Sequence, residues 1–384
     1  MRQSAILCYS LVVLVLALGG ALFYAVEAAE EQPLVDAAPA ELVEGRASVP
    51  KQYVGPQACV ECHRAEYSVW ARTPHATNAY DLLRTSSNAA RYAANLDIDP
   101  GQVSNHPRCL ACHSTPQGEA ANNTGVVLGV TCEACHNAAG GEGGWLNIHA
   151  TYGSRSERRG DETPTHRQQR IARCRTAGQH RCDDLYSLAR QCYECHIVGD
   201  EELVVRGGHH PGNPGFEMSS WFEDEIRHNL CLDTSRNGLA PSLWIDGLWR
   251  PDRQPGKEID HRRVMYVVAT LVDLEVSLRN RGRAKHSSFA TAAATRIIAA
   301  SSRLAAIAKE SETPELEQAV DAVTELEPIL FSPPSQNDVD RFLDAADTVG
   351  EIATQVSSAD NGEQYSAVDR FLDSQVDQPH PAGE

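Results

Sequence analysis

The sequence predicts a mainly α-helical protein in two parts, a loop-rich region over residues 53–250 and a helical bundle over residues 258–376. Two observations support this division. The first part is rich in Gly, Pro, Asn and His and carries four copies of one cysteine motif, whereas the second part repeats apolar residues at helical spacing. We expect residues 377–384 to form a disordered tail.

The N-terminus predicts export. A short basic start is followed by an apolar run over residues 5–26, which is typical of a signal peptide, and Ala28 and Ala29 offer a cleavage site. The run has about 20 residues, enough to span a bilayer. A cleaved signal peptide and a retained membrane anchor over residues 1–28 are therefore both open. Residues 29–52 are acidic and aperiodic, which predicts a flexible linker.

Four Cys-x-x-Cys-His motifs dominate the first part. One such motif is also compatible with a zinc ligand pair or a redox dithiol. Four copies, with no Cys-x-x-Cys pair that lacks the following histidine, argue against both. In c-type haem attachment, two thiols one helical turn apart bind one porphyrin, and the following histidine binds the iron. We predict four c-type haems, held by Cys59, Cys62, His63, Cys109, Cys112, His113, Cys132, Cys135, His136, Cys192, Cys195 and His196.

The second axial ligand of each iron decides the function. A second histidine gives a saturated electron carrier, whereas a vacant position lets the haem bind a small molecule. Methionine is a poor candidate, because only Met218 and Met265 follow the start residue. The expected distal ligands are His75, His149, one of the pair His209 and His210, and His228. We expect His106 to be structural, and His166, His180, His261, His286 and His380 to be ordinary histidines.

The composition indicates which partners the protein can bind and what fills its interior. Aromatic residues make up only 6% of the chain, and bound porphyrin would replace them as apolar filling, so we expect the apoprotein not to fold in the haem region. The net charge of −18 argues against nucleic acid, which needs a basic surface. It suits a redox partner with a basic docking surface, although simple solubility explains the charge equally well.

Four cysteines lie outside the motifs. Cys8 falls inside the apolar N-terminal run, whereas Cys174, Cys182 and Cys231 would be exported, so a disulfide between two of these three is expected. Their spacing does not select the pair. The polar, Arg-rich stretch 151–178 predicts an exposed insertion between the third and fourth motifs.

Helical periodicity is clearest after residue 258. Apolar spacing predicts helices over residues 264–278, 289–309, 315–326, 339–356 and 365–376. Thr313 followed by Pro314 predicts an N-cap and first helical residue, and Ser335 or Asn337 would cap the next helix.

At its motifs the chain resembles the tetrahaem cytochrome c-554 family over residues 57–210. The first motif continues to Trp70, Thr73 and His75, and the segment 129–133 leads into the third motif, as in that family. The resemblance implies stacked haem pairs and periplasmic electron transfer. It also implies that His75 serves a different haem from the one it follows, and that a residue like His149 is a distal ligand.

The resemblance has two further consequences. It implies that the haem of the second motif, bound by His113, lacks a sixth ligand. The chain departs from the family at Asn137, where glycine is usual, and in its longer helical C-terminal part.

The sequence therefore predicts an exported tetrahaem c-type cytochrome in the periplasm or another extracytoplasmic compartment, which relays electrons between periplasmic or membrane redox partners. Inner-membrane association through residues 5–26 is expected if the anchor is retained. The alternative is a multihaem oxidoreductase acting on a small nitrogen species at a five-coordinate haem. Because every motif ends in histidine, an electron carrier is favoured over an enzyme. The C-terminal helices are a candidate docking module.

Overall fold

The computed structural model describes residues 52–115, 129–151, 162–181, 183–213, 215–221, 258–333, 335–359 and 361–373. Several predicted features lie outside the described residues: the apolar segment 5–26, nearly all of the linker, Cys8, Cys182, His228, Cys231, the 250–258 boundary and the tail. Residues 50–384 belong to one compact unit. The described part of the chain is mostly helical, as predicted.

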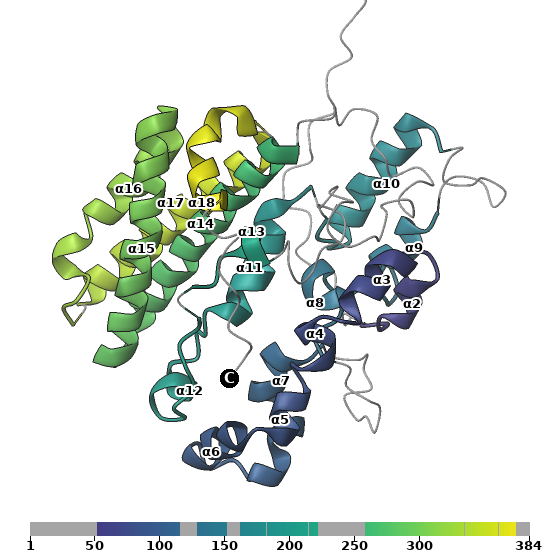
Figure 1. Cartoon of the computed structure of the whole chain (residues 1–384), viewed down its shortest axis with the longest axis horizontal. Helices are drawn as coiled ribbons and strands as arrows, with labels where there is room; N and C mark the ends of the chain where they lie inside the picture. The colour runs from purple at the N-terminus through teal and green to yellow at the C-terminus, as the bar shows by residue number, and fades with distance from the viewer. Residues whose placement is uncertain are drawn as a thin grey trace, which may run out of the picture. The chain divides into compact units, whose positions relative to one another are not determined.

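Short helices make up the haem-motif region, by which we mean residues 52–221 (Figure 1). They are α2 (Gln57–Val60), α3 (Arg64–Trp70), α4 (Pro74–Thr77), α5 (Asp81–Thr85), α6 (Ser87–Asn95), the 3₁₀ helix η2 (Pro100–Asn105), α7 (Pro107–His113), α8 (Cys132–His136), α9 (Trp145–His149), α10 (Pro164–Thr176), α11 (Leu185–His196), α12 (Glu201–Val205) and α13 (Met218–Trp221). The loops between them bring the motifs together.

Longer helices form the C-terminal helical region, residues 258–373. They are α14 (Glu258–Arg283), α15 (Ser287–Ser311), α16 (Pro314–Thr324) and α17 (Gln336–Ala359), with the short elements η7 (Glu327–Ile329), η8 (Gly362–Val368) and α18 (Asp369–Asp373). Within the described ranges, no helix has the length and apolar character needed to cross a membrane.

Two helices of this region begin at the residues that the capping signals predict. Thr313 occupies the N-cap position of α16 with Pro314 at the first turn, although the Thr313 hydroxyl donates to Ser311 Oγ (2.7 Å) and does not cap the helix. Ser335 begins α17, because its Oγ accepts from Asp338 N (3.3 Å) while the Asp338 carboxylate accepts from Ser335 N (2.9 Å). Ser335, and not Asn337, is therefore the cap.

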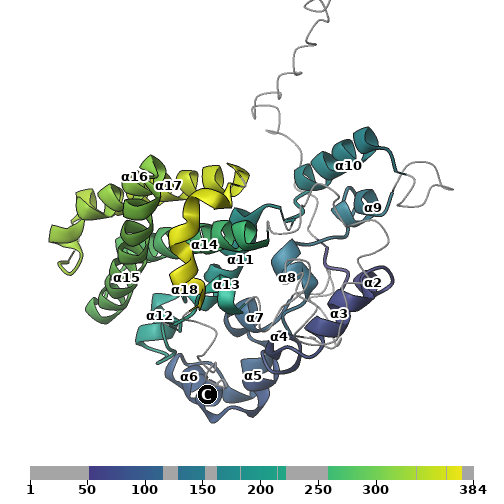
Figure 2. The ribbon, with the colours of Figure 1, turned by 45° about the horizontal axis from the view of Figure 1, so that its top comes forward.

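Helix α14 is the centre of the largest hydrophobic cluster. It packs against α11, α15, α17 and η8, and Figures 1 and 2 show it between α11 and α15. Its residues from Val264 to Leu278 are buried, which the spacing alone did not predict because Asp273, Glu275 and Ser277 interrupt the apolar run. A helix buried all round is a core helix and not a surface helix with one apolar face.

Arginines from α15 make this burial possible at Asp273. Its two carboxylate oxygens lie 2.6 Å from Arg296 Nε and 3.1 Å from an Arg303 guanidinium nitrogen. Burial raises the pKa of Asp273, and the two guanidinium groups oppose that change. A buried carboxylate is tolerated where charged partners satisfy its oxygens.

Glu275 connects α14 with the helix that carries the fourth motif. Its side chain is fully buried and lies 2.6 Å from Arg190 and 2.9 Å from Arg279, and it accepts a hydrogen bond from the Tyr186 hydroxyl (3.1 Å). Because Arg190 and Tyr186 belong to α11, this carboxylate joins the C-terminal helices to a haem-motif helix.

The predicted exposed insertion over residues 151–178 is in part a packed helix. Helix α10 spans residues 164–176 and buries Arg170 and Cys174. Arg170 pairs with Glu162 (2.6 Å) and donates to the backbone oxygen of His149 (3.1 Å), so α10 is anchored to α9. Most described side chains of this stretch are exposed or half-buried, as predicted, and the prediction fails at Arg170 and Cys174, which are buried against α9.

Candidate functional site

Helices present the four Cys-x-x-Cys-His motifs. The second motif ends α7, the third forms α8 and the fourth ends α11, whereas the first continues from α2 through a turn to His63. In a helix the first cysteine, the second cysteine and the histidine occupy positions i, i+3 and i+4, which lie on one face. The second, third and fourth motifs therefore each present their thiols and their imidazole in the same direction.

Two of the motif histidines are held by backbone oxygens. The Nδ1 atom of His113 lies 2.7 Å from Ala79 O, and that of His136 lies 2.8 Å from His180 O. A carbonyl only accepts hydrogen bonds, so Nδ1 carries the proton in both rings. In this tautomer Nε2 carries the lone pair that a metal would bind, which is the arrangement that orients metal-binding histidines.

Histidines from distant segments face two other motif histidines. The ring centroids of His63 and His149 are 5.9 Å apart, and those of His196 and His75 are 6.0 Å apart. A metal–imidazole bond is about 2 Å long, so two imidazoles on opposite sides of one iron have ring centres about 6 Å apart. The residues present therefore fit two bis-histidine irons. His75 and His149 each approach the histidine of a motif other than the one they follow.

Aromatic side chains fix the orientation of these rings. Phe216 stacks on His196 with ring centroids 4.0 Å apart and an interplanar angle of 6°, and Trp145 contacts His149 edge-on at 5.9 Å. Burial lowers the pKa of His75 and lowers that of His196 to about 3. Both imidazoles are therefore neutral near pH 7, as metal ligands must be.

Thiols of different motifs lie beside each other. The thiols of Cys59 and Cys132, from the first and third motifs, lie close enough to interact, and so do those of Cys112 and Cys195, from the second and fourth. These interactions raise the pKa of Cys59 and of Cys195. The third and fourth motifs meet at Cys135 and Cys192, where burial raises the pKa of Cys135 to about 11 and that of Cys192 further. The motifs thus adjoin in the order first, third, fourth, second.

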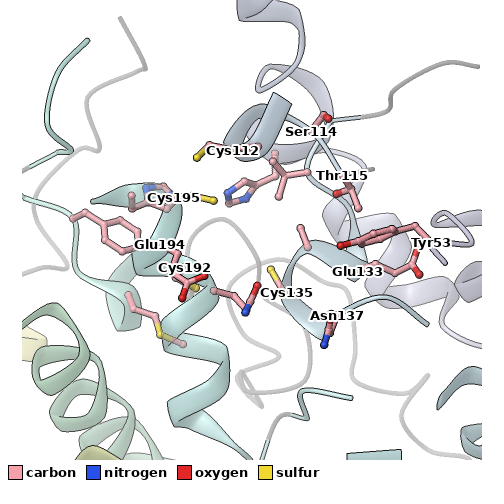
Figure 3. A pocket seen from close by; sticks show the side chains of 18 residues that line it. Tyr53, Cys112, Ser114, Thr115, Glu133, Cys135, Asn137, Cys192, Glu194 and Cys195 are labelled. Carbon is pink, nitrogen blue, oxygen red and sulfur yellow. The ribbon is translucent and has the colours of Figure 1, made fainter. Parts of the chain in front are cut away.

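A cavity of about 380 Å³ opens between the second, third and fourth motifs (Figure 3). Cys112, Cys135, Cys192 and Cys195 line it, and Figure 3 shows these thiols around one space. Its volume falls in the usual range of ligand pockets. Within the described ranges, no group of three or more His, Cys, Asp or Glu side chains is placed to hold a bare metal ion.

Glu133, between the cysteines of the third motif, is a buried anchor that sequence reasoning missed. Its carboxylate accepts hydrogen bonds from the backbone nitrogens of Val54 (2.9 Å), Gly55 (2.8 Å) and Ala139 (2.8 Å). Only 2% of the residue is exposed. It ties the segment before the first motif and the segment after the third motif to α8. The signals in the sequence were its charge inside a Cys-x-x-Cys pair and its place in the segment 129–133 that carries the resemblance, but neither predicted this anchoring role.

The segments that carry the family resemblance are bonded to each other. Trp70 Nε1 donates to Val130 O (2.8 Å), and Val130 N donates to His75 O (3.0 Å). Gly129 has a φ of +82°, and a Cβ there would overlap the His75 carbonyl oxygen, so only glycine fits. The tryptophan, His75 and the residues before the third motif therefore form one structural unit.

Asn137 shows how the chain departs from the family at the usual glycine. Its backbone has φ +67° and ψ 161°, a conformation that favours glycine. The side chain donates to Gly178 O (3.0 Å), and the backbone oxygen accepts from Trp145 Nε1 (3.2 Å). These bonds link α8, α9 and the end of α10, so the asparagine adds a contact that glycine would not make.

The structure also describes the positions of three other histidines and one cysteine that the sequence analysis named. His106 Nδ1 accepts from Arg108 N (3.3 Å) at the start of α7, which confirms a structural role. His209 and His210 lie in the loop after α12. Cys174 is a buried free thiol 3.8 Å from Trp145 O. Because Cys182 and Cys231 lie outside the described residues, the disulfide stays a prediction.

A helical scaffold with these attachment motifs and facing histidines has the features of a c-type cytochrome. Residues 58–137 match the family model of cytochrome c554 and c-prime, a span that covers the first three motifs. This match supports a c-type cytochrome family, with covalent haem and haem-based electron transfer. Searches of curated proteins and of solved structures gave no significant match.

Proposed function

We propose that this protein is an exported tetrahaem c-type cytochrome that carries electrons between redox partners. The observation that carries the proposal is the pairing of His63 with His149 and of His196 with His75, at centroid separations of 5.9 and 6.0 Å. Each pair joins a motif histidine to a distant histidine. Two strong ligands on one iron favour electron transfer over substrate binding.

Side chains of the four motifs would attach the haems and bind their irons. The motif cysteines supply eight thioether positions, and His63, His113, His136 and His196 supply the proximal nitrogens. When bound, haem supplies reversible one-electron redox chemistry. The protein keeps the imidazoles neutral and oriented through burial, carbonyl hydrogen bonds and aromatic contacts. The distal ligand opposite His136 is proposed to be His228, on sequence grounds alone.

The contacts between motifs support a connected set of haems. Each motif touches another through a cysteine, in the order first, third, fourth, second. Isolated haem sites would not require thiols of different motifs to lie close enough to interact. This arrangement supports a relay with its two ends at the first and second motifs.

Export and partner choice are proposed from the sequence. The apolar segment 5–26 supports translocation out of the cytoplasm, as cleaved signal or anchor, and the acidic chain supports encounter with a basic redox partner. Steering between opposite charges weakens with salt, so the rate of electron exchange with such a partner should fall as ionic strength rises.

Haem counting tests the proposal. The full chain is produced in a host that attaches c-type haem, and intact mass measured after denaturation is expected to show four covalent haems. His75→Ala and His149→Ala should each convert one haem to high spin, whereas His286→Ala, at the exposed N-cap of α15, should not. Fewer than four haems, or low-spin spectra in both variants, would contradict the proposal.

Carbon monoxide binding tests the oxidoreductase alternative. An enzyme of that kind needs a five-coordinate haem that binds small ligands. We expect the reduced wild-type protein to bind no carbon monoxide. Binding at one haem, together with turnover of hydroxylamine or nitrite, would favour the alternative over the electron carrier.

A further inference from the structure

We infer that His209 is the distal ligand of the haem attached by the second motif, so that this haem is six-coordinate. The inference rests on the proposed function, because it concerns one of the four haems. It differs from the expectation drawn from the family resemblance, in which the haem bound by His113 is open on one side.

Ion pairs hold the loop that carries His209 against the second motif. Arg108 lies directly before Cys109, and its guanidinium group lies 2.8 Å from Asp200 and 2.8 Å from Glu202. Asp200 caps α12 and Glu202 lies within it. The helix preceding the His209 loop is therefore attached to the helix that ends in His113.

Contacts with α6 position the loop from a second side. Asn95 donates to Gly207 O (2.9 Å), and Arg206 pairs with Asp97 just beyond the end of α6. The ring of Tyr92 lies 5.4 Å from that of His209. Figures 1 and 2 both show α12 beside α6 and α7. Because α6 shares a hydrophobic cluster with Cys109 and Leu110, these contacts set His209 against the second motif.

The end of the loop is fixed to the fourth motif. Val198 N donates to Pro211 O (3.0 Å), and Ile197 forms an antiparallel bridge with Gly212. Gly212 has a φ of +121°, and a Cβ there would overlap the backbone oxygen of His196. The loop is thus held at both ends, between the helices that carry the second and fourth motifs.

Hydrogen bonds distinguish His209 from His210. The Nδ1 atom of His209 donates to His210 O (2.7 Å), which leaves Nε2 unprotonated and able to bind a metal. The Nδ1 atom of His210 accepts from Gly212 N (3.2 Å), so the neutral ring carries its proton on Nε2. His209 is also half-buried, whereas His210 is exposed. Only His209 presents a free Nε2.

The electrostatics of His113 agree with this placement. Burial and the nearby His209 lower the pKa of His113, and His113 in turn lowers the pKa of His210. Both histidines of the loop therefore lie near the proximal ligand of the second motif, and their hydrogen bonds select His209. His113 also keeps its Nε2 free through the Ala79 bond. The two rings then each offer one free nitrogen to the same iron.

Ligand binding to cavity variants of the full holoprotein tests the inference. His209→Gly should create one high-spin haem and bind about one more carbon monoxide per chain than wild type. Added imidazole should restore the low-spin spectrum of this variant. His210→Gly is the matched control, because it removes the neighbouring ring and should leave the carbon monoxide stoichiometry at the wild-type value.

Two results would overturn the inference. One is a His209→Gly protein that binds no more carbon monoxide than wild type, and the other is an equal gain in His210→Gly. His209→Met guards against a misfolded glycine variant, since it should keep six ligands and raise the potential of one haem; unchanged potentials would also overturn the inference. A chain that attaches no haem would instead refute the proposed function.

Discussion

The haem-motif region and the C-terminal helical region acquire their cores in different ways. In the C-terminal helical region, three helices of 24 to 26 residues share one large hydrophobic cluster. In the haem-motif region the helices have 4 to 13 residues, and the two clusters of its own contain three buried residues each. Four of its motif cysteines and His196 line the cavity between the second, third and fourth motifs. The comparison indicates that one region is filled by side chains, and that the other needs haem as filling.

Removal of the haem attachment sites should cause the largest difference in amide protection between the haem-motif region and the C-terminal helical region. A full chain with all eight motif cysteines replaced by alanine should lose amide protection over most of residues 52–184, since nothing replaces the porphyrin as apolar filling. Residues 258–373 should stay protected. Hydrogen exchange of this variant beside the wild-type holoprotein measures the difference, and native protection in both regions would show that the haem-motif region has a sufficient core.

Within the haem-motif region, Glu133→Ala should have the next largest effect. It leaves two buried backbone N–H groups and one partly buried group without acceptors, at about 1–3 kcal/mol for each buried group, so we expect a loss of at least about 2 kcal/mol. Urea unfolding of the holoprotein, followed by haem absorbance, measures it. Glu133→Gln keeps one oxygen acceptor and should lose less; an alanine variant as stable as wild type would mean that the anchor is not needed.

The contact between the two regions depends on a buried ion pair. Arg190→Ala leaves the fully buried Glu275 with Arg279 and Tyr186 only, so it should destabilise the protein by about 2 kcal/mol. Arg206→Ala is the matched control, because its pairs with Asp97 and Glu202 are exposed and should contribute less to stability than the buried pair. Equal losses in the two variants would show that α11 does not depend on Glu275.

The smallest expected effect concerns an ion pair inside the C-terminal helical region. The hydrogen bond from Arg263 lowers the pKa of Asp369 below its ordinary value of 3.8, so its contribution is complete above about pH 4 and is lost as the pH falls through the lowered value. Asp369→Asn should cost about 0.5 kcal/mol at pH 7, because the carboxylate is 41% exposed. Urea titrations from pH 7 to pH 3 should show the difference between the variant and the wild type shrinking, and a difference that stays constant would contradict the prediction.

Local signals predicted local structure well. The cysteine motifs, the capping box at Ser335 and the Thr313–Pro314 start of α16 each depend on residues within one helical turn, and the structure confirms their positions. The structural role of His106 is of the same kind. Such features are readable because the donor and acceptor are close in sequence.

Features that depend on distant partners were not predicted. The burial of Asp273 requires Arg296 and Arg303, which lie on another helix, and the packing of α10 requires Arg170 to donate to the backbone oxygen of His149 in α9. Polarity alone places such residues at the surface. Histidine counting likewise found His75 and His149 but did not assign them to motifs from residue spacing, since each approaches a motif histidine far along the chain.

The close approach of Gly129 to the His75 carbonyl limits which substitutions the protein accepts at residue 129. A side chain at codon 129 would displace the backbone of His75, and with it the imidazole that faces His196 in another motif. A saturation library at that codon, selected for redox-active colonies, should return glycine alone. The same selection at codon 137 should return both asparagine and glycine. The requirement for glycine at codon 129 would thus follow from the pairing of His75 with His196, which lies more than sixty codons downstream of codon 129.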